Sequence, residues 1–199
     1  AYLGDVAPHV KVVAVEYEES ACLKLALETG QRAILPHVGL FADGTAVAQI
    51  GALPFEVLQL EKSDGSGKII ESEVVTVNTD EICAAIKDTY DENRSIVEPS
   101  GAMALAGIKK YVAQHNIENK NMVSIVCGAN MNFDRLRFIA ERTELGEHRE
   151  AVYAVTLPEQ KGAFLAFCRA LQGRNITEFN YRYNGSDKAQ VFVGISLKN

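Results

Sequence analysis

The stretch Val74–Ile82, which reads VVTVNTDEI, decides the fold class of this chain. Its first four residues are all β-branched, a composition typical of a short buried strand. The polar residues after them begin a helix, because Thr79 is a candidate N-cap and Ile82 stands where an apolar helix face would begin. The pattern predicts a helix that runs to about Asn93. A strand followed directly by a helix is the repeating unit of an α/β fold.

The same alternation continues on both sides of this stretch. Two further apolar runs predict buried strands, and several stretches with apolar residues at helical spacing predict helices. One of these helices ends at Gly30, a residue typical of a helix C-cap. The predicted strands cover 11–16 and 122–126, and the predicted helices cover 19–29, 54–61, 100–114 and 133–144. Strands that alternate with helices favour a parallel sheet.

The C-terminal quarter of the chain follows a different pattern, which indicates a small α+β region. It predicts a strand, a helix and two more strands, at 150–157, 162–171, 175–183 and 189–197. Asn184–Asp187, between the last two strands, has the composition of a hairpin turn. We therefore expect two domains, 1–146 and 147–199, with the boundary near Leu145–Arg149.

Composition places the chain among ordinary globular proteins. Of its 199 residues, 47% are hydrophobic and 23% are charged, which excludes a disordered chain or a collagen-like fibre. A net charge of −6 disfavours a nucleic-acid binder, and no apolar run approaches the roughly 18 residues that a membrane span needs. The four cysteines form no CxxC pair and the four histidines have no ligand spacing, so we expect neither a disulfide nor a metal site.

Five motifs, in order along the chain, resemble one family. They are FADGTAV at 41–47, TDEICAA at 79–85, EPSGA at 98–102, CGANMNF at 127–133 and TEFNYRY at 177–183. Together they are similar to the biosynthetic threonine dehydratases, which are pyridoxal-phosphate enzymes of the tryptophan-synthase-β fold type (fold type II). The resemblance implies an α/β parallel-sheet portion of that catalytic domain at 1–146. It also implies a partial ACT-like regulatory subdomain of βαββ order at 147–199.

The resemblance further implies that part of the family's machinery has no counterpart in this chain. The Schiff-base lysine and the glycine-rich phosphate loop of the family are not matched, and the regulatory subdomain stops after its third strand. The one Gly-x-Gly, Gly65–Gly67, has no helix after it and is a poor candidate for binding a phosphate. The chain also opens at Ala1 without a methionine or a basic leader. We therefore expect a fragment of a longer enzyme, inactive by itself.

Three residues of the first region are candidate site residues by this resemblance. Cys127 matches the family position that faces the pyridine nitrogen of pyridoxal phosphate, where a neutral thiol leaves that nitrogen unprotonated. By residue type alone, a cysteine after an apolar strand is more often a small buried hydrophobe. Glu98 matches a glutamate close to the cofactor ring and the reacting carbons; alternatively, it favours the dipole of the next helix. Gly44 matches a glycine whose backbone passes near the cofactor, because only glycine permits that approach or a positive φ, unless it is an ordinary turn glycine.

The activity implied is that of an L-threonine ammonia-lyase, which forms 2-oxobutanoate and ammonia in isoleucine biosynthesis. Phe164, two residues after Gly162, resembles the effector site of the regulatory subdomain; alternatively, it is a core phenylalanine. The effector implied is isoleucine, with valine as a second candidate. The family further implies a homo-oligomer, dimer or tetramer. It also implies a soluble intracellular protein, cytoplasmic in bacteria and mitochondrial or plastid in eukaryotes.

Two other functions are left open. One is a serine or threonine dehydratase or a racemase of the same fold. In the related serine racemases a glutamate and an aspartate help bind a divalent cation; Glu16 matches the glutamate, but Cys22 stands where the aspartate would be, so we expect no metal. The other is a non-catalytic amino-acid-binding module. It is disfavoured because a parallel sheet without its lysine-bearing lobe would expose apolar surface.

Overall fold

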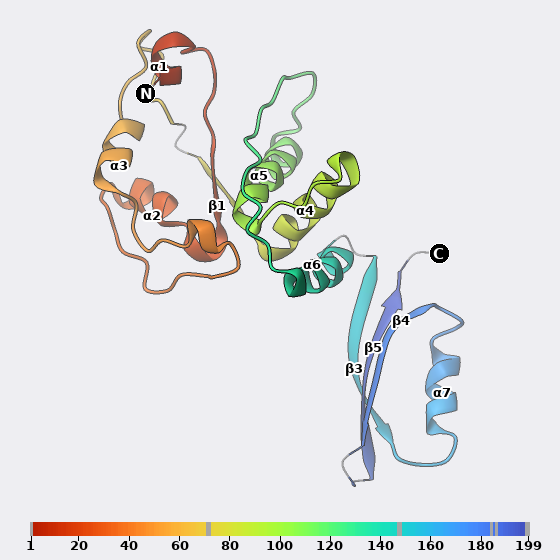
Figure 1. Cartoon of the computed structure of the whole chain (residues 1–199). Helices are drawn as coiled ribbons and strands as arrows, with labels where there is room; N and C mark the ends of the chain where they lie inside the picture. The colour runs from red at the N-terminus through yellow and green to blue at the C-terminus, as the bar shows by residue number, and fades with distance from the viewer. Residues whose placement is uncertain (1, 71–72, 147–148, 184, 186, 198–199) are drawn as a thin grey trace. The chain divides into compact units, whose positions relative to one another are not determined.

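Figure 1 shows the computed structural model of the chain, which describes residues 2–70, 73–146, 149–183, 185 and 187–197. The chain divides into two compact units, Ala1–Ile139 and Ala140–Asn199, and each has its own hydrophobic core. The division falls inside helix α6 (Phe133–Gly146). The domain boundary after residue 146 stays a prediction, and residues 147 and 148 beside it lie outside the described residues.

The first unit is built around two parallel strands and two long helices. Strands β1 (Ala14–Tyr17) and β2 (Val74–Val77) pair in register along their whole length. Helices α4 (Thr79–Asn93) and α5 (Pro99–His115) follow β2 in the chain. The α/β class and the parallel pairing predicted from the alternation of strands and helices are confirmed.

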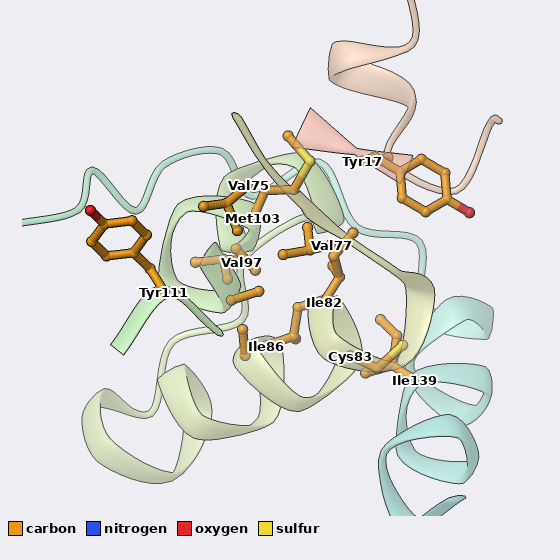
Figure 2. Packing of buried hydrophobic residues seen from close by; sticks show 14 residues of the cluster. Tyr17, Val75, Val77, Ile82, Cys83, Ile86, Val97, Met103, Tyr111 and Ile139 are labelled. Carbon is orange, nitrogen blue, oxygen red and sulfur yellow. The ribbon is translucent and has the colours of Figure 1, made fainter. Parts of the chain in front are cut away.

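The core of this unit lies between β2, α4 and α5. Figure 2 shows Val75, Val77, Ile82, Ile86 and Met103 gathered at its centre, and all five are buried. Full burial of an aliphatic side chain of this size contributes roughly 1.5–3 kcal/mol. The sequence predicts an apolar face on α4 that begins in its first turn. Burial of this face holds the helix against the strands.

The first turn of α4 is capped by Asn78, so the prediction of Thr79 as N-cap is wrong. Oδ1 of Asn78 accepts the backbone N–H of Glu81 at 2.9 Å, and Oε2 of Glu81 accepts the N–H of Asn78 at 2.8 Å. This reciprocal pair is a capping box. The hydroxyl of Thr79 instead forms a 3.0 Å hydrogen bond with the hydroxyl of Tyr17, because Thr79 is already inside the helix.

Shorter elements complete the first unit. Gly30 ends α2 in the left-handed region, with φ of 70°, which confirms it as a C-cap. The helix predicted at 54–61 is found a little earlier, at 52–58. The elements are helices α1 (Tyr2–Val6), α2 (Cys22–Thr29) and α3 (Ala52–Leu58), with the 3₁₀ turns η1 (Glu18–Ser20) and η2 (Asp43–Thr45).

The segment between α5 and α6 is irregular, and the strand predicted at 122–126 is wrong. Within the described residues this segment has no strand beside it, and its apolar side chains face solvent: Val123 is 90% exposed and Ile125 is 78% exposed. A strand is stable only with hydrogen-bonded neighbours and one buried face. The apolar pattern is present in the sequence, but the described chain offers it no partner.

The second unit has the predicted order of strand, helix, strand and strand. These are β3 (Glu150–Pro158), α7 (Ala163–Ala170), β4 (Ile176–Tyr183) and β5 (Lys188–Ser196). The sheet order is β3-β5-β4 with antiparallel pairing throughout, so β4 is an edge strand. In the turn predicted at Asn184–Asp187, Asn184 and Ser186 lie outside the described residues.

One face of this sheet carries the core of the second unit. Val191, Val193 and Ile195 of β5 are buried, and Phe167 and Leu171 pack against them from α7 and the residue after it. The alternation of these β5 residues along the strand places them on one face. No helix in the described part of the chain is long and apolar enough to cross a membrane.

Candidate functional site

The first turn of α5 gathers the candidate residues of the first unit. Glu98 is the N-cap of α5, and its side chain makes no capping hydrogen bond to the helix. Instead, Oε2 of Glu98 accepts the N–H of Asn130 at 3.1 Å, and the N–H of Glu98 donates to the carbonyl of Gly128 at 3.1 Å. The carboxylate thus lies beside the positive end of the helix dipole, and its hydrogen bond to Asn130 holds the segment that follows Cys127.

Two glycines allow that segment to approach α5 at backbone distance. A Cβ on Gly101 would lie 1.4 Å from the carbonyl oxygen of Cys127. A Cβ on Gly128 would lie 2.2 Å from Oε1 of Glu98, and the φ of Gly128 is 76°, in the region that favours glycine. Cys127 is therefore held next to Glu98 by close backbone packing.

Gly44 approaches the same turn from an earlier part of the chain. A Cβ on Gly44 would lie 2.9 Å from Oγ of Ser100 and 3.4 Å from Oε1 of Glu98. Its φ is not positive, so the close approach, and not the backbone conformation, requires glycine here. The structure thus brings together the three residues that the motifs predicted, Gly44, Glu98 and Cys127.

The loop that carries Gly44 is held by short local contacts. The N–H of Gly44 donates to Oδ1 of Asp43 at 3.1 Å, and Nη1 of Arg135 lies 3.7 Å from the same oxygen. The hydroxyl of Thr45 donates to the carbonyl of Ala42 at 3.0 Å. Asp43 and Arg135 are both partly exposed, so their ion pair contributes little to stability. The tight turn itself therefore sets the position of Gly44.

Cys127 is exposed in the structure. The interpretation of this residue as a small buried hydrophobe, which its type alone favours, is therefore wrong. Its thiol is free, and the segment around it, residues 120–130, is exposed at nearly every position. The backbone of Cys127 lies against Gly101, which keeps the residue at the first turn of α5.

Ser100 belongs to the same cluster, and sequence reasoning missed it. Its Oγ is buried and has no hydrogen-bond partner among the described residues. The signal that could have found it is the EPSGA motif itself, in which Ser100 is two residues after Glu98. A buried hydroxyl without a partner is rare, because it loses its hydrogen bonds to water without replacement.

Glu16 has a structural role at the start of α2. Its two carboxylate oxygens accept the N–H groups of Leu23 and Lys24, each at 2.8 Å. Cys22 is buried next to it; burial raises the pKa of the Cys22 thiol, and the nearby Glu16 carboxylate adds to this effect. No group of three possible metal ligands occurs in the part of the chain that the structure describes.

The polar loop around Gly65 and Gly67 borders a hollow of about 560 Å³ between the loop, α2 and the end of α3. Both glycines have positive φ, and residues 61 and 68 form an isolated antiparallel bridge. Among residues 59–70, which the structure describes, no helix starts at this loop, so these residues do not form the helix N-terminus of a glycine-rich phosphate site.

In the second unit, Phe164 lies in the first turn of α7 and is 43% exposed. Its ring lies 5.3 Å from that of Phe179 and 6.4 Å from that of Tyr181, in edge-to-face geometry. Phe167 and Leu171, by contrast, contact the buried residues of β5. Phe164 thus lies outside the buried core, and the alternative interpretation as a core phenylalanine is wrong.

The start of α7 is open. Gly162, its N-cap, has φ of 93°. Apart from Gly162 and its two chain neighbours, no described residue has an atom within 4 Å of the position where a Cβ would stand. The hydroxyl of Tyr181 donates to the carboxylate of Glu159 nearby, and this hydrogen bond is the main reason why the pKa of Tyr181 is raised. Exposed aromatic rings and free space therefore meet at this helix N-terminus.

Comparisons with known proteins identify the relatives of this chain. Residues 141–199 match the model of the C-terminal regulatory domain of threonine dehydratase. The chain is 52% identical over 195 residues to the L-threonine dehydratase biosynthetic IlvA of Escherichia coli (strain K12), which covers 98% of this chain and 36% of that protein. It is 48% identical over 200 residues to the mitochondrial threonine dehydratase of Schizosaccharomyces pombe, covering 100% of this chain and 32% of that protein.

A solved structure shows the same fold. The processed form of threonine deaminase isoform 2 from Solanum lycopersicum matches with a TM-score of 0.60 and 41% identity, over 69% of this chain and 37% of that chain. The chain thus spans about a third of the length of its curated relatives. Residues 1–128, which hold the whole cluster around α5 up to Gly128, match the model of pyridoxal-phosphate dependent enzymes. The chain belongs to the pyridoxal-phosphate-dependent enzyme family.

Proposed function

We propose that this chain provides part of the cofactor site and a regulatory unit of an L-threonine ammonia-lyase, which converts threonine to 2-oxobutanoate and ammonia for isoleucine biosynthesis. The observation that carries the proposal is the meeting of Gly44, Glu98 and Cys127 at the first turn of α5. Their three motifs are far apart in the sequence, yet they meet at one helix turn.

The residues present fit pyridoxal phosphate by two features. Gly44 and Gly128 lack the Cβ atoms that would fill the space beside the Glu98 carboxylate, and Cys127 is exposed at the same helix turn. When bound, the cofactor supplies an electron-withdrawing ring that makes loss of the Cα proton and of the β-hydroxyl possible.

Each of these residues has a separate task in the proposed site. Cys127 offers a weak, neutral donor to the ring nitrogen, which keeps that nitrogen unprotonated. Glu98 holds a carboxylate beside the reacting atoms while its Oε2 stays bound to the N–H of Asn130. The backbone of Gly44 lets the ring approach without a steric clash.

A chimera tests the proposal. This chain would replace the corresponding 195 residues of the Escherichia coli relative, so that the remainder of that protein supplies the segments that this chain lacks. We expect the chimera to form 2-oxobutanoate from threonine, and we expect the 199-residue chain alone to form none even with added cofactor. A folded chimera that binds the cofactor and converts serine but not threonine would contradict the proposed substrate.

Substitutions in the chimera test the residue roles. Glu98→Gln is expected to lower kcat by about 100-fold, the usual size for a carboxylate that acts at the reacting atoms. Cys127→Ala is expected to change the absorbance spectrum of the bound cofactor, because its ring nitrogen loses a partner. Cys168→Ala, in the second unit and partly buried, is the matched control and should leave the spectrum unchanged.

For regulation, isoleucine is the proposed effector and valine the second candidate, with binding at the start of α7. Support comes from the match of residues 141–199 to a regulatory domain, the free space at Gly162 and the exposed ring of Phe164. Free N–H groups at a helix N-terminus suit the carboxylate of an amino acid, and the aromatic rings suit its apolar side chain.

Calorimetry with isoleucine and the 199-residue chain tests this site. We expect Phe164→Ala to weaken binding, and Leu165→Ala, which changes a residue that is also exposed on α7, is the control. Heat of binding that is unchanged in Phe164→Ala would place the effector elsewhere. A homo-oligomer, dimer or tetramer, is the proposed assembly, and sedimentation velocity of the chimera measures it.

A further inference from the structure

Ser100 has a feature that its place in the fold does not explain. It is the second residue of α5, directly after Pro99, and its Oγ is shielded from solvent. The described residues provide this oxygen with no hydrogen-bond partner. An unpaired buried hydroxyl is unfavourable, so Ser100 lowers the stability of the fold unless its hydroxyl finds a partner in another state of the site.

Glu98 offers a candidate acceptor in the same cluster. Its Oε2 is engaged by the N–H of Asn130, whereas the described chain provides no donor for Oε1. Oγ of Ser100 and Oε1 of Glu98 both crowd the same empty position beside Gly44, at 2.9 Å and 3.4 Å from where its Cβ would stand. A donor without an acceptor and an acceptor without a donor therefore meet where Gly44 leaves space.

We propose that Ser100 is a positioning residue, whose hydroxyl donates a hydrogen bond to Oε1 of Glu98 when the site is occupied. This inference rests on the proposed function, because it takes Glu98 as the carboxylate beside the reacting atoms. Hydrogen bonds in catalytic sites are often open without ligand and close in the complex. With both oxygens held, by Asn130 and by Ser100, the carboxylate has one fixed orientation.

A double-mutant cycle in the chimera tests the pairing. Ser100→Ala is expected to lower kcat about tenfold with a smaller change in KM, because a loosened carboxylate affects the reaction more than binding. In the Glu98→Gln background, the same substitution should lower kcat by less than about twofold, since the partner is already impaired. Ser95→Ala, an exposed serine shortly before the helix, is the matched control and should leave kcat unchanged.

The cycle also separates this inference from the proposed function. A chimera without threonine turnover contradicts the proposed function. A chimera in which Glu98→Gln lowers kcat, but Ser100→Ala has no effect or an independent, additive effect, overturns the role of Ser100 alone. Fluorescence of the bound cofactor provides a readout besides activity, and Ser100→Ala should shift it in the same direction as Glu98→Gln.

Stability of the 199-residue chain provides an independent test that does not need the chimera. Because the hydroxyl of Ser100 has no hydrogen-bond partner among the described residues, Ser100→Ala should leave the urea midpoint unchanged or raise it. If the hydroxyl stabilised the fold through a hydrogen bond, Ser100→Ala would instead lower the urea midpoint. A clear drop in the midpoint of Ser100→Ala, compared with Ser95→Ala, would therefore overturn the inference.

Discussion

The cluster at the first turn of α5 and the region at the first turn of α7 are built in opposite ways. At α5, segments approach so closely that glycine is the only residue that fits; a Cβ on Gly101 would lie 1.4 Å from a backbone oxygen. At α7, no described residue beyond the two chain neighbours of Gly162 comes within 4 Å of its Cβ position, and aromatic rings remain exposed. The first region has fixed geometry, as catalysis requires, and the second has room for a ligand to enter.

The largest effect should come from Gly101→Ala. The added methyl group would clash with the carbonyl of Cys127, and backbone cannot move aside as a flexible side chain can. We expect the free energy of unfolding of the first unit to fall by about 3 kcal/mol. The turnover of the chimera should fall by about 100-fold, because Cys127 and Glu98 move apart. Urea denaturation monitored by hydrogen exchange distinguishes the two units and measures the change in the free energy of unfolding of the first unit.

Gly162→Ala is the matched comparison in the second unit. It adds the same methyl group into open space, so only the positive φ of 93° opposes it, and we expect a loss of about 1 kcal/mol. If this variant destabilised its unit more than Gly101→Ala destabilises the first, the contrast between a closely packed and an open region would be wrong.

A smaller effect is expected from Asn78→Ala at the start of α4. The substitution removes one half of the capping box with Glu81, and such caps contribute about 1 kcal/mol. Thr79→Ala removes only the hydroxyl contact with Tyr17 and serves as the comparison. Thermal unfolding of the chain gives both values, and a larger loss in Thr79→Ala would restore Thr79 as the more important residue of this turn.

The smallest effect concerns the hydroxyl of Tyr181, whose pKa is raised above 10.0, mainly by its hydrogen bond to Glu159. A raised pKa favours the neutral phenol in the folded chain, so its contribution to stability is present below pH 10 and is lost as the pH rises through the folded pKa. We expect Glu159→Gln to lower the pKa of Tyr181. Ultraviolet titration of tyrosinate measures it, with Tyr181→Phe identifying the signal; an unchanged curve would show that Glu159 has no influence.

Most elements could be predicted from the sequence because their signals are local. The β-branched run at 74–77 and the apolar face of α4 are found where they were expected, and so is the C-cap at Gly30. The N-cap of α4 was misplaced by one residue, because Asn78 and Thr79 are both good capping residues and only the backbone geometry distinguishes them.

The candidate site was predictable in its members but not in its geometry. The motifs pointed to Gly44, Glu98 and Cys127 one by one, but nothing in their spacing shows that they meet at one helix turn. Ser100 was missed because serine is an ordinary residue near a helix start, and its unpaired hydroxyl is visible only when its neighbours are placed.

The sequence by itself determined the local elements, the α/β class and the family, since these depend on residue types and on motifs read along one line. Only the tertiary structure decided what surrounds each residue. In the structure, Cys127 is exposed and the hydroxyl of Ser100 is buried. The carboxylate of Glu16 accepts a hydrogen bond from the start of α2, and the apolar run at 122–126 has no strand partner in the described chain. The physical reason is that burial and strand pairing depend on segments that are distant in the chain. A local pattern indicates which element a segment can form, but not which distant segment packs against it.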